Sequence, residues 1–454
     1  MIVERIESEG LAHFSYIVVE GSKAFVVDPR RDCEVYLAIA RREGARITHV
    51  FETHRNEDYV IGSMEVSERT GAIACHGPGL DFDYGETLED GQVFAFGDLE
   101  LTALHTPGHT DESMSYVLVD KGSGYDAVAV FTGDALFVGD VGRTDLPGPD
   151  KRERLSHALF HSLHDRLMTL GDGTIVHPGH GAGSVCGGDI SERAFSTIGL
   201  ERLQNPLLRL TEEEFVKDRM GQRLDRPPYF RRMESMNLHG HPAMSGLPEP
   251  IPLSPKGFKA ALDRGGSLLD LRTPDSVSGA YIKGATSIWL DGLAAYVGWL
   301  MQYDAPIYLV VEDPLQVERA VRILVRMGYD NVAGYLRGGM SQWLREGHPY
   351  EVLPTLNVHQ TRDLVKQGKA VILDPRPGHE WEEVRVPGAM HVFVGELQSR
   401  LSEVPSFTKV ACMCSAGFRG SMAAVMLRNL GYENAFNVLG GIGAWKAAGY
   451  ETEE

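Results

Sequence analysis

The sequence predicts an α/β protein of three domains, and three observations lead to that prediction. The chain has 454 residues with 43% hydrophobic content, which is more than one ordinary hydrophobic core uses. Between residue 14 and about residue 180, short strand-like runs alternate with helical patterns. Beyond residue 250 the chain repeats its own landmarks at an interval of about a hundred residues, which is the length of a domain and not of a solenoid unit.

Runs of apolar and β-branched residues at 14–19 and 24–28 predict the first strands of the N-terminal domain. A helical pattern at 35–43 follows, and a further strand is expected at 47–52. Three later strands, each ending just before a loop marked by Gly or Pro, are expected at 99–104, 127–131 and 174–176. Because loops at strand ends carry functional side chains, we expect one sheet edge to gather the polar residues that follow these strands.

A proline-rich stretch, residues 242–254, is predicted to be the linker that ends the N-terminal domain of residues 1–241. Two similar domains are expected after it, over residues 255–350 and 351–454. Their matched landmarks are Asp270 and Asp374, Arg272 and Arg376, Gly284 and Gly388, Gly339 and Gly441, and Trp343 and Trp445. The C-terminal half is therefore predicted to be a tandem duplication of a small α/β domain.

Composition excludes several function classes. The balance of 44 Lys+Arg against 63 Asp+Glu gives a net charge of −19, which argues against a nucleic-acid partner. The sequence has no apolar run near the roughly 20 residues that span a bilayer, and its start shows no secretory pattern, so we expect no membrane partner. Five scattered cysteines indicate free thiols in a reducing compartment, and hence a cytoplasmic protein. Self-association into a homo-oligomer is left open.

Three residues in the loops after predicted strands have the donor types of a metal site: His54, His109 and Asp134. Two histidines and one carboxylate suit a single non-haem Fe(II) with open coordination positions, so we expect Fe(II), one per chain, with Zn(II) less favoured. A second metal would find only Asp58 and His180 beside a shared Asp134. Four residues are expected to lie around the ligands and to orient them or hold water: Asn56, Asp58, Tyr59 and His180.

Two further residues are candidates for substrate binding near this centre. Arg143 could bind a substrate carboxylate, because a guanidinium holds such groups with two hydrogen bonds; the alternative is a structural salt bridge. Cys186, in a glycine-rich loop shortly after His180, could relay sulfur or line the pocket, and the alternative is an inert thiol.

A second candidate site lies in the last domain. Cys414 follows the apolar run 409–413 and precedes a helical pattern at 421–429, so backbone N–H groups and a helix N-terminus can surround its sulfur. Such a cradle lowers the pKa of a thiol and stabilises a persulfide. The loop residues expected to bind substrate are Ser415, Ala416, Gly417 and Phe418, and Cys414 and Arg419 are the expected catalytic residues. Alignment of the repeats places Val311 opposite Cys414 and Gln316 opposite Arg419, so the first copy lacks a nucleophile and is expected to be a spacer or docking module.

Segments 53–63, 105–113, 131–145 and 177–187 resemble the metallo-β-lactamase superfamily and, within it, persulfide dioxygenases. The Cys-x4-Arg loop resembles that of rhodaneses, whereas phosphatase loops are one residue longer. The resemblance implies an N-terminal metallo-β-lactamase αββα sandwich followed by two rhodanese-like α/β domains with parallel sheets, the first of them degenerate. It also implies iron held by His54, His109 and Asp134. Asn56 and Tyr59 depart from the superfamily's loop, which has histidines at both positions.

The activity implied by the resemblance is oxidation of a low-molecular-weight persulfide, such as glutathione persulfide, by O2 to sulfite and thiol. Cys414 would exchange sulfane sulfur with thiosulfate, sulfite or a thiol through an enzyme persulfide. Two alternatives are open. One is a zinc thioester hydrolase similar to glyoxalase II, and the other is a sulfurtransferase whose N-terminal domain only binds thiols.

Overall fold

The computed structural model describes residues 1–454 except 125 and 223. The chain divides into two compact units, residues 1–247 with 325–328, and residues 248–324 with 329–454. Among the described residues, no helix is long and apolar enough to cross a membrane.

The first unit contains two six-stranded sheets. The strand order of the first sheet is β1 (Ile2–Ser8), β2 (His13–Glu20), β3 (Lys23–Val27), β4 (Arg46–Phe51), β5 (Ile73–His76) and β6 (Glu86–Thr87). The order of the second is β12 (Ser196–Thr197), β11 (Ile175–Pro178), β10 (Ala127–Gly133), β9 (Met114–Asp120), β8 (Leu99–His105) and β7 (Val93–Phe96). The predicted strands are confirmed, with ends that differ by a few residues.

Strand β2 shows why the two sheets stack. Tyr16 and Val18 belong to a core that also contains Phe25, Phe51, Leu101 and Phe131 from both sheets. Ile17 and Val19 point the other way, into a core with Tyr36 and Ile39 of helix α1 (Glu34–Arg42). Successive side chains of a strand face opposite sides of a sheet. This alternation therefore buries one face of the sheet against the second sheet and the other against a helix.

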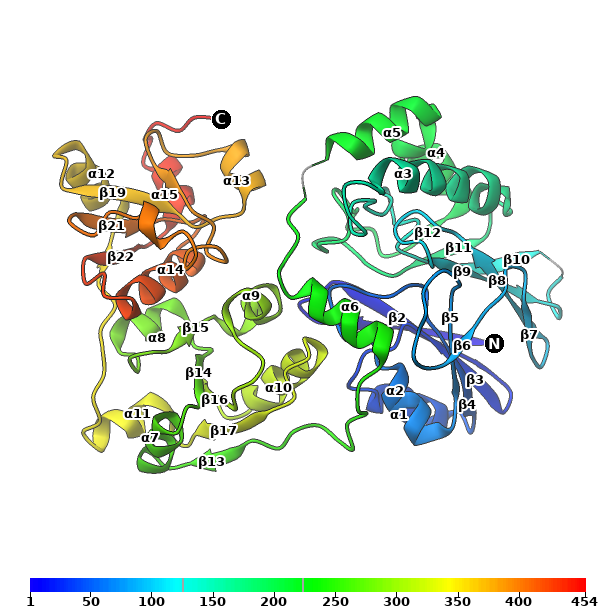
Figure 1. The fold of residues 1–454 in the computed structure, drawn as a ribbon, viewed down its shortest axis with the longest axis horizontal. Helices are drawn as coiled ribbons and strands as arrows, with labels where there is room; N and C mark the ends of the chain where they lie inside the picture. The colour runs from blue at the N-terminus through cyan, green and yellow to red at the C-terminus, as the bar shows by residue number, and fades with distance from the viewer. Residues whose placement is uncertain (125, 223) are drawn as a thin grey trace. The chain divides into compact units, whose positions relative to one another are not determined.

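Helices cover the outer faces of both sheets (Figure 1). The outer core of the second sheet joins Val130 and Val176 to Leu159 and Phe215 of the helices. The predicted αββα sandwich is thus confirmed. The remaining helical segments of this unit are α2 (Ser63–Thr70), α3 (Arg152–His161), η1 (Ser162–Arg166), η2 (Leu167–Thr169), α4 (Ile198–Gln204), η3 (Leu207–Arg209), α5 (Glu212–Gly221) and α6 (Phe230–His239).

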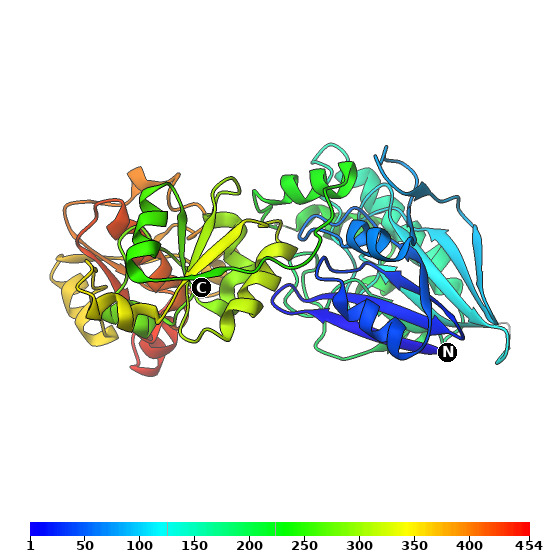
Figure 2. The same cartoon turned by 90° about the horizontal axis from the view of Figure 1, so that it is seen from below.

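The second unit contains two five-stranded sheets of the same strand order. One is β13 (Ile251–Leu253), β17 (Val332–Leu336), β16 (Ile307–Val310), β14 (Ser267–Asp270) and β15 (Thr286–Ser287). The other is β18 (Thr355–Leu356), β22 (Ala435–Val438), β21 (Lys409–Cys412), β19 (Ala370–Asp374) and β20 (Met390–His391). All pairings in both sheets are parallel, and helices surround each sheet (Figure 2). The predicted duplication is visible as two copies of one topology.

Helical segments complete the two copies. In the first they are α7 (Pro255–Asp263), α8 (Pro274–Gly279), η4 (Leu290–Gly292), α9 (Leu293–Leu300), α10 (Gln316–Arg326) and α11 (Gly339–Arg345). In the second they are α12 (Val358–Lys366), α13 (Gly378–Glu383), η5 (Leu401–Glu403), α14 (Phe418–Asn429) and α15 (Gly441–Ala447).

The matched landmarks hold equivalent positions in both copies. Arg272 forms an ion pair with Asp270, and Arg376 forms one with Asp374. The indole N–H groups of Trp343 and Trp445 each donate to the carbonyl six residues later, at Pro349 and Glu451.

Part of the predicted linker is ordered in a sheet. Residues 251–253 form β13, which pairs with β17 at the edge of the first rhodanese-like sheet. Pro252 is tolerated there because an edge strand leaves one side without ladder hydrogen bonds. The predicted boundaries at 241, 254 and 350 stay predictions.

Candidate metal centre and sulfur-transfer loop

The predicted metal ligands meet, but they come from two sheets. His54 follows β4 of the first sheet, whereas His109, Asp134 and His180 follow β8, β10 and β11 of the second. The expectation that one sheet edge gathers them is therefore wrong, because the sandwich brings loops from both sheets together. Gly133 marks the contact: its φ is +50°, and a Cβ there would lie 2.5 Å from the Thr53 side chain. Only glycine allows this approach.

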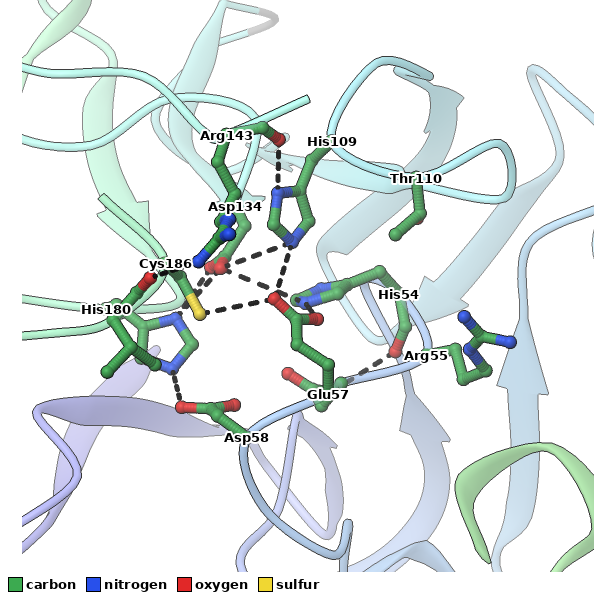
Figure 3. Close-up of polar contacts among 12 residues, drawn as sticks. His54, Arg55, Glu57, Asp58, His109, Thr110, Asp134, Arg143, His180 and Cys186 are labelled. Carbon is green, nitrogen blue, oxygen red and sulfur yellow. Dashed lines mark hydrogen bonds and ion pairs between the residues drawn. The ribbon is translucent and has the colours of Figure 1, made fainter. Parts of the chain in front are cut away.

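Both imidazoles and the carboxylate of the predicted triad point at one another (Figure 3). Asp134 Oδ2 lies 3.9 Å from His54 Nε2 and 3.6 Å from His109 Nε2. All three side chains are buried. Ligand atoms bound at about 2.1 Å to a common ion lie roughly 3 to 4 Å apart, so these distances suit donors to one metal.

The hydrogen-bond partners of both histidines fix their tautomers. His109 Nδ1 lies 2.9 Å from the carbonyl of Arg143, which can only accept, so Nδ1 carries the hydrogen. Thr53 Oγ1 donates to Asp28 Oδ2 at 2.7 Å and therefore accepts from His54 Nδ1 at 2.9 Å. In the neutral ring each Nε2 has a lone pair, and both atoms are buried and without a hydrogen-bond partner among the described residues. Since buried polar atoms are normally satisfied, two such nitrogens fit a metal that the fold family implies.

His180 is engaged differently. Its Nδ1 lies 2.8 Å from Asp134 Oδ1, and its Nε2 lies 3.1 Å from Asp58 Oδ2. Burial opposes the charged ring, but these two carboxylates outweigh burial and hold the pKa of His180 well above its usual value. Asp58, His180 and Cys186 do offer donor atoms within 4.8 Å of one another. Both His180 nitrogens face carboxylates, so the side chain orients Asp134.

Asn56 fastens the metal loop through its side chain. Its amide donates to the carbonyl of His54 at 3.2 Å. Asn237, on α6, donates to the carbonyls of Asn56 and Tyr59 at 2.6 and 2.8 Å and accepts from the N–H of Ile61. Tyr59 packs its ring on His13 at 4.0 Å. The two residues that replace the superfamily's histidines thus lie in the packing of the loop, and sequence analysis missed Asn237 because it is so distant in the chain.

Glu57 is the acidic residue that sequence analysis passed over. Its Oε1 lies 3.3 Å from His109 Nε2, and its Oε2 lies 3.8 Å from His54 Nε2. Burial would raise its pKa, but His109 and His54 outweigh burial and lower it. The same carboxylates, Glu57 and Asp134, overcome burial at His109 and raise the pKa of that ring to about 9. The sequence did contain an indication of Glu57, because this carboxylate follows the predicted ligand His54 by three residues in the same loop.

Arg143 and Cys186 both lie beside the cluster. The Arg143 guanidinium makes two 2.7 Å bonds to Asp145 and donates to the carbonyls of Val185 and Asp225. The pair with Asp145 fits the alternative of a structural salt bridge, and the Arg143 carbonyl faces His109 Nδ1. Binding of a substrate carboxylate by Arg143 stays a prediction. Cys186 Sγ lies 3.4 Å from Glu57 Oε1. Burial, together with Asp58 and Glu57, holds the pKa of Cys186 well above its usual value, so its sulfur lines the cluster as a neutral thiol.

In the last domain, Cys414 lies in the predicted strand, loop and helix, between β21 and α14. Its sulfur accepts a hydrogen bond from the N–H of Gly417 at 3.0 Å. The carbonyl of Cys414 accepts from Ile442, and a Cβ at Gly441 would lie 2.0 Å from that oxygen. The Gly-Gly landmark is therefore explained by close backbone approach. Binding of substrate by Ser415, Ala416 and Phe418 stays a prediction.

Arg419 is held beside the loop by an acidic residue that sequence analysis missed. Glu380, on α13, forms an ion pair with Arg419, with Oε2 2.9 Å from Nη2. The same guanidinium nitrogen donates to Ser415 Oγ at 2.7 Å. Arg419 is thereby fixed beside the loop that carries Cys414, and its catalytic role stays a prediction.

The strand register of the two copies confirms the alignment of the repeats. Asp270 pairs with Val310, and Leu373 pairs with Cys412 one position earlier, so Val311 occupies the place of Cys414. The first copy nevertheless contacts the loop of the second. Its Trp289 ring lies 5.0 Å from Phe418 and 5.6 Å from Tyr296. Burial raises the pKa of Tyr296, the positive charge of Arg419 opposes the rise, and Glu380 and Cys414 add to it.

Comparison with known proteins bears on both parts of the chain. The metallo-beta-lactamase superfamily model matches residues 9–180. The N-terminal domain of the chain belongs to the metallo-β-lactamase superfamily. The model of the rhodanese-like domain matches residues 254–346 and 357–448. The predicted architecture, a metallo-β-lactamase domain with persulfide dioxygenase relatives followed by two rhodanese-like domains, is confirmed.

Relatives of the metallo-β-lactamase domain include two kinds of enzyme. A mitochondrial persulfide dioxygenase of Bos taurus is 29% identical over 206 residues, 44% of this chain and 71% of the relative. A hydroxyacylglutathione hydrolase of Tolumonas auensis is 32% identical over 173 residues, 37% of this chain and 61% of the relative. The crystal structure of a metallo-beta-lactamase from Staphylococcus aureus subsp. aureus COL has a TM-score of 0.66 and 28% identity, and the match covers 74% of this chain and 99% of that one.

The tautomer argument predicts the effect of changing Thr53 to valine. Thr53→Val keeps the shape of the side chain but removes the acceptor of His54 Nδ1–H. Affinity for the divalent metal should fall about 10- to 100-fold, as for other residues that orient a ligand. Metal retained after dialysis against graded chelator measures this. Thr48→Val is the control, because the hydroxyl of Thr48, on β4, donates to the carbonyl of Ala24 on β3 at 3.4 Å. Equal retention by the two variants would contradict the argument.

Proposed function

We propose that the chain is an iron-dependent persulfide dioxygenase fused to a sulfurtransferase. The observation that carries the proposal is the pair of buried, unpartnered Nε2 atoms of His54 and His109 beside Asp134, with His180 bound between two carboxylates. Such a donor set favours one ion over two, and Fe(II) in two-histidine, one-carboxylate sites is the common oxygen-activating case. The persulfide dioxygenase relative supports the same assignment.

The reaction that we propose is persulfide, RSSH, plus O2 and water giving thiol, RSH, and sulfurous acid. The outer sulfur loses four electrons, O2 gains them, and the S–S bond breaks. Fe(II), when bound, supplies open coordination positions for the sulfur and O2. The residues of this chain hold the donors in place: Asp28 through Thr53 orients His54, the Arg143 carbonyl orients His109, and His180 orients Asp134.

The second activity that we propose is sulfur transfer at Cys414. The Cys414 thiolate attacks the outer sulfur of thiosulfate, the S–S bond breaks, and sulfite leaves with the electron pair. A thiol then attacks the Cys414 persulfide and takes the sulfur, which regenerates the thiolate. The Gly417 N–H faces the sulfur that carries the charge in both steps. Sulfite links the two activities, because it is the product of the first and the leaving group, or the acceptor in reverse, of the second.

We propose a cytoplasmic site of action, because all five cysteines are free thiols, as is usual in a reducing compartment. The rival function is a binuclear zinc thioester hydrolase, which the hydroxyacylglutathione hydrolase relative favours. Metal analysis of the purified chain separates the functions. One iron supports the dioxygenase, two zinc ions support the hydrolase, and a protein without metal supports a domain that only binds thiols.

The metal assignment predicts the loss of oxygen consumption in His109→Ala. Protein purified anaerobically and given glutathione persulfide should take up O2 and form sulfite, and removal of this ligand should abolish both. An oxygen electrode measures the uptake. The matched control is His105→Ala, because His105 lies at the end of β8 and bonds the carbonyl of Asp111 outside the cluster. Iron-loaded wild-type protein that takes up no O2 with several persulfides contradicts the proposal.

Replacement of the proposed nucleophile separates the two activities. Cys414→Ser should remove thiosulfate:thiol sulfur transfer and leave O2 consumption intact, since the two sites belong to different domains. Release of sulfite from thiosulfate measures the transfer. Cys412→Ala is the control, because Cys412 is a buried strand residue. Unchanged transfer in Cys414→Ser would refute the assignment.

Tyr296 of the first rhodanese-like copy lies near Arg419 of the second, so a change at Tyr296 should affect sulfur transfer. Tyr296→Phe removes the hydroxyl whose pKa the nearby Arg419 guanidinium lowers, and the loss of one polar contact of this kind costs about 1 kcal/mol. The KM for thiosulfate should rise about fivefold, because Arg419 is held less firmly. Steady-state kinetics compare this variant with Tyr308→Phe, on strand β16. Identical KM values would show that the first copy does not act on the loop.

A further inference from the structure

We propose that Glu57 is a fourth protein ligand of the metal, which makes the centre a site of two histidines and two carboxylates. The inference rests on the metal centre of the proposed function and changes its donor set. Glu57 is distinct from the three residues that the resemblance to persulfide dioxygenases implies.

The first observation is the placement of the Glu57 carboxylate between the two unpartnered nitrogens (Figure 3). Its oxygens lie 3.3 Å from His109 Nε2 and 3.8 Å from His54 Nε2. Asp134 Oδ2 lies 3.6 and 3.9 Å from the same two nitrogens. Glu57 thus bears the same relation to both imidazoles as the predicted carboxylate ligand. His54, Glu57 and His109 also place their donor atoms within 4.8 Å of one another.

The second observation concerns the bonding left to Glu57. The side chain is 1% exposed, and Oε2 has no hydrogen-bond partner among the described residues. The nearby Arg143 guanidinium bonds Asp145 and two carbonyls. A buried carboxylate is costly unless it is paired or bound to a metal. Cys186 Sγ, 3.4 Å from Oε1, gives only a weak hydrogen bond.

A simple ion pair between Glu57 and His109 does not account for this placement in the loaded protein. His109 Nδ1 is bonded to the Arg143 carbonyl, so Nε2 is the nitrogen that must hold the metal. Glu57 faces that same nitrogen. Once Nε2 binds an ion, it carries no proton for Glu57 to accept, and the carboxylate would lose its partner unless it bound the ion too.

A second carboxylate changes the chemistry of the centre. Two carboxylates neutralise a divalent ion, and oxygen donors shift preference from zinc toward iron and manganese. One fewer coordination position is left to substrate than in a three-ligand site. Glu57 follows His54 by three residues in one loop, so one segment supplies half of the donors.

The test uses the full chain and three variants. Glu57→Gln keeps the shape and removes the charged donor. Glu57→His replaces the carboxylate with another ligand. Glu112→Gln is the matched control, because Glu112 is buried and its carboxylate accepts from the N–H of Arg55 in the same loop. Thermal unfolding of the metal-free proteins shows that each variant folds.

Two measurements decide the matter without reference to activity. Anaerobic competition with a chromophoric chelator should give a dissociation constant for Fe(II) about 10- to 100-fold higher in Glu57→Gln, and within about threefold of wild type in Glu112→Gln. X-ray absorption should count two imidazoles on the iron of wild type and three in Glu57→His. If the protein retains zinc and not iron, the same measurements apply to Zn(II).

Glu57→Gln that binds metal as wild type does, or Glu57→His that shows two imidazoles, overturns the proposal. Wild-type protein that binds neither metal also overturns it. These outcomes are distinct from failure of the proposed function. A four-ligand iron centre without O2 uptake refutes the dioxygenase and keeps Glu57 as a ligand, whereas O2 uptake that persists with unchanged metal affinity in Glu57→Gln refutes only the role of Glu57.

Discussion

The fixed position of one hydrogen on each of two imidazoles is the constraint on which the N-terminal centre depends. It begins at Asp28, a non-glycine residue with a φ of 46°, a backbone conformation that is uncommon and costly. From there the Asp28 carboxylate accepts from the N–H and the hydroxyl of Thr53. The Thr53 hydroxyl in turn accepts from His54 Nδ1–H, and the Arg143 carbonyl accepts from His109 Nδ1–H. The strained backbone at Asp28 therefore helps to direct the Nε2 lone pair of His54 at the metal position.

Much of this could be predicted from the sequence because it is local. Alternating patterns predicted the strands, and loops after strands predicted His54, His109 and Asp134 as neighbours. What the sequence could not show were contacts between distant segments. Whether strand ends belong to one sheet or two depends on stacking, so the single-edge expectation failed. Glu57 was missed because a loop side chain can face either way, and Asn237, Glu380 and Tyr296 because no periodicity links them to their sites.

The two copies in the C-terminal half show which features the fold requires and which features belong to the Cys414 site. Both copies keep the Asp-Arg ion pair, the Trp N–H bond and the strand order. At the loop that follows β16, the first copy has Val311 and Gln316 at the places that Cys414 and Arg419 hold in the second copy. In the first copy a cavity of about 510 Å³ lies at that loop, lined in part by Val311, Glu312 and Gly339. The scaffold thus persists without the nucleophile, and it now presents Trp289 and Tyr296 to the neighbouring loop.

The bonds of Asn237 have a consequence for where the N-terminal domain can be cut or recombined. The superfamily match ends at residue 180, after the four donors of the proposed centre, His54, Glu57, His109 and Asp134. A segment ending there would contain all the donors but lack α6, whose Asn237 side chain satisfies three backbone groups of the loop that carries His54 and Glu57. Ordering each loop residue costs about 1 to 2 kcal/mol of conformational entropy, and α6 offsets part of that cost. The shortest segment that holds the metal loop in a fixed conformation is therefore longer than the segment that matches the superfamily model.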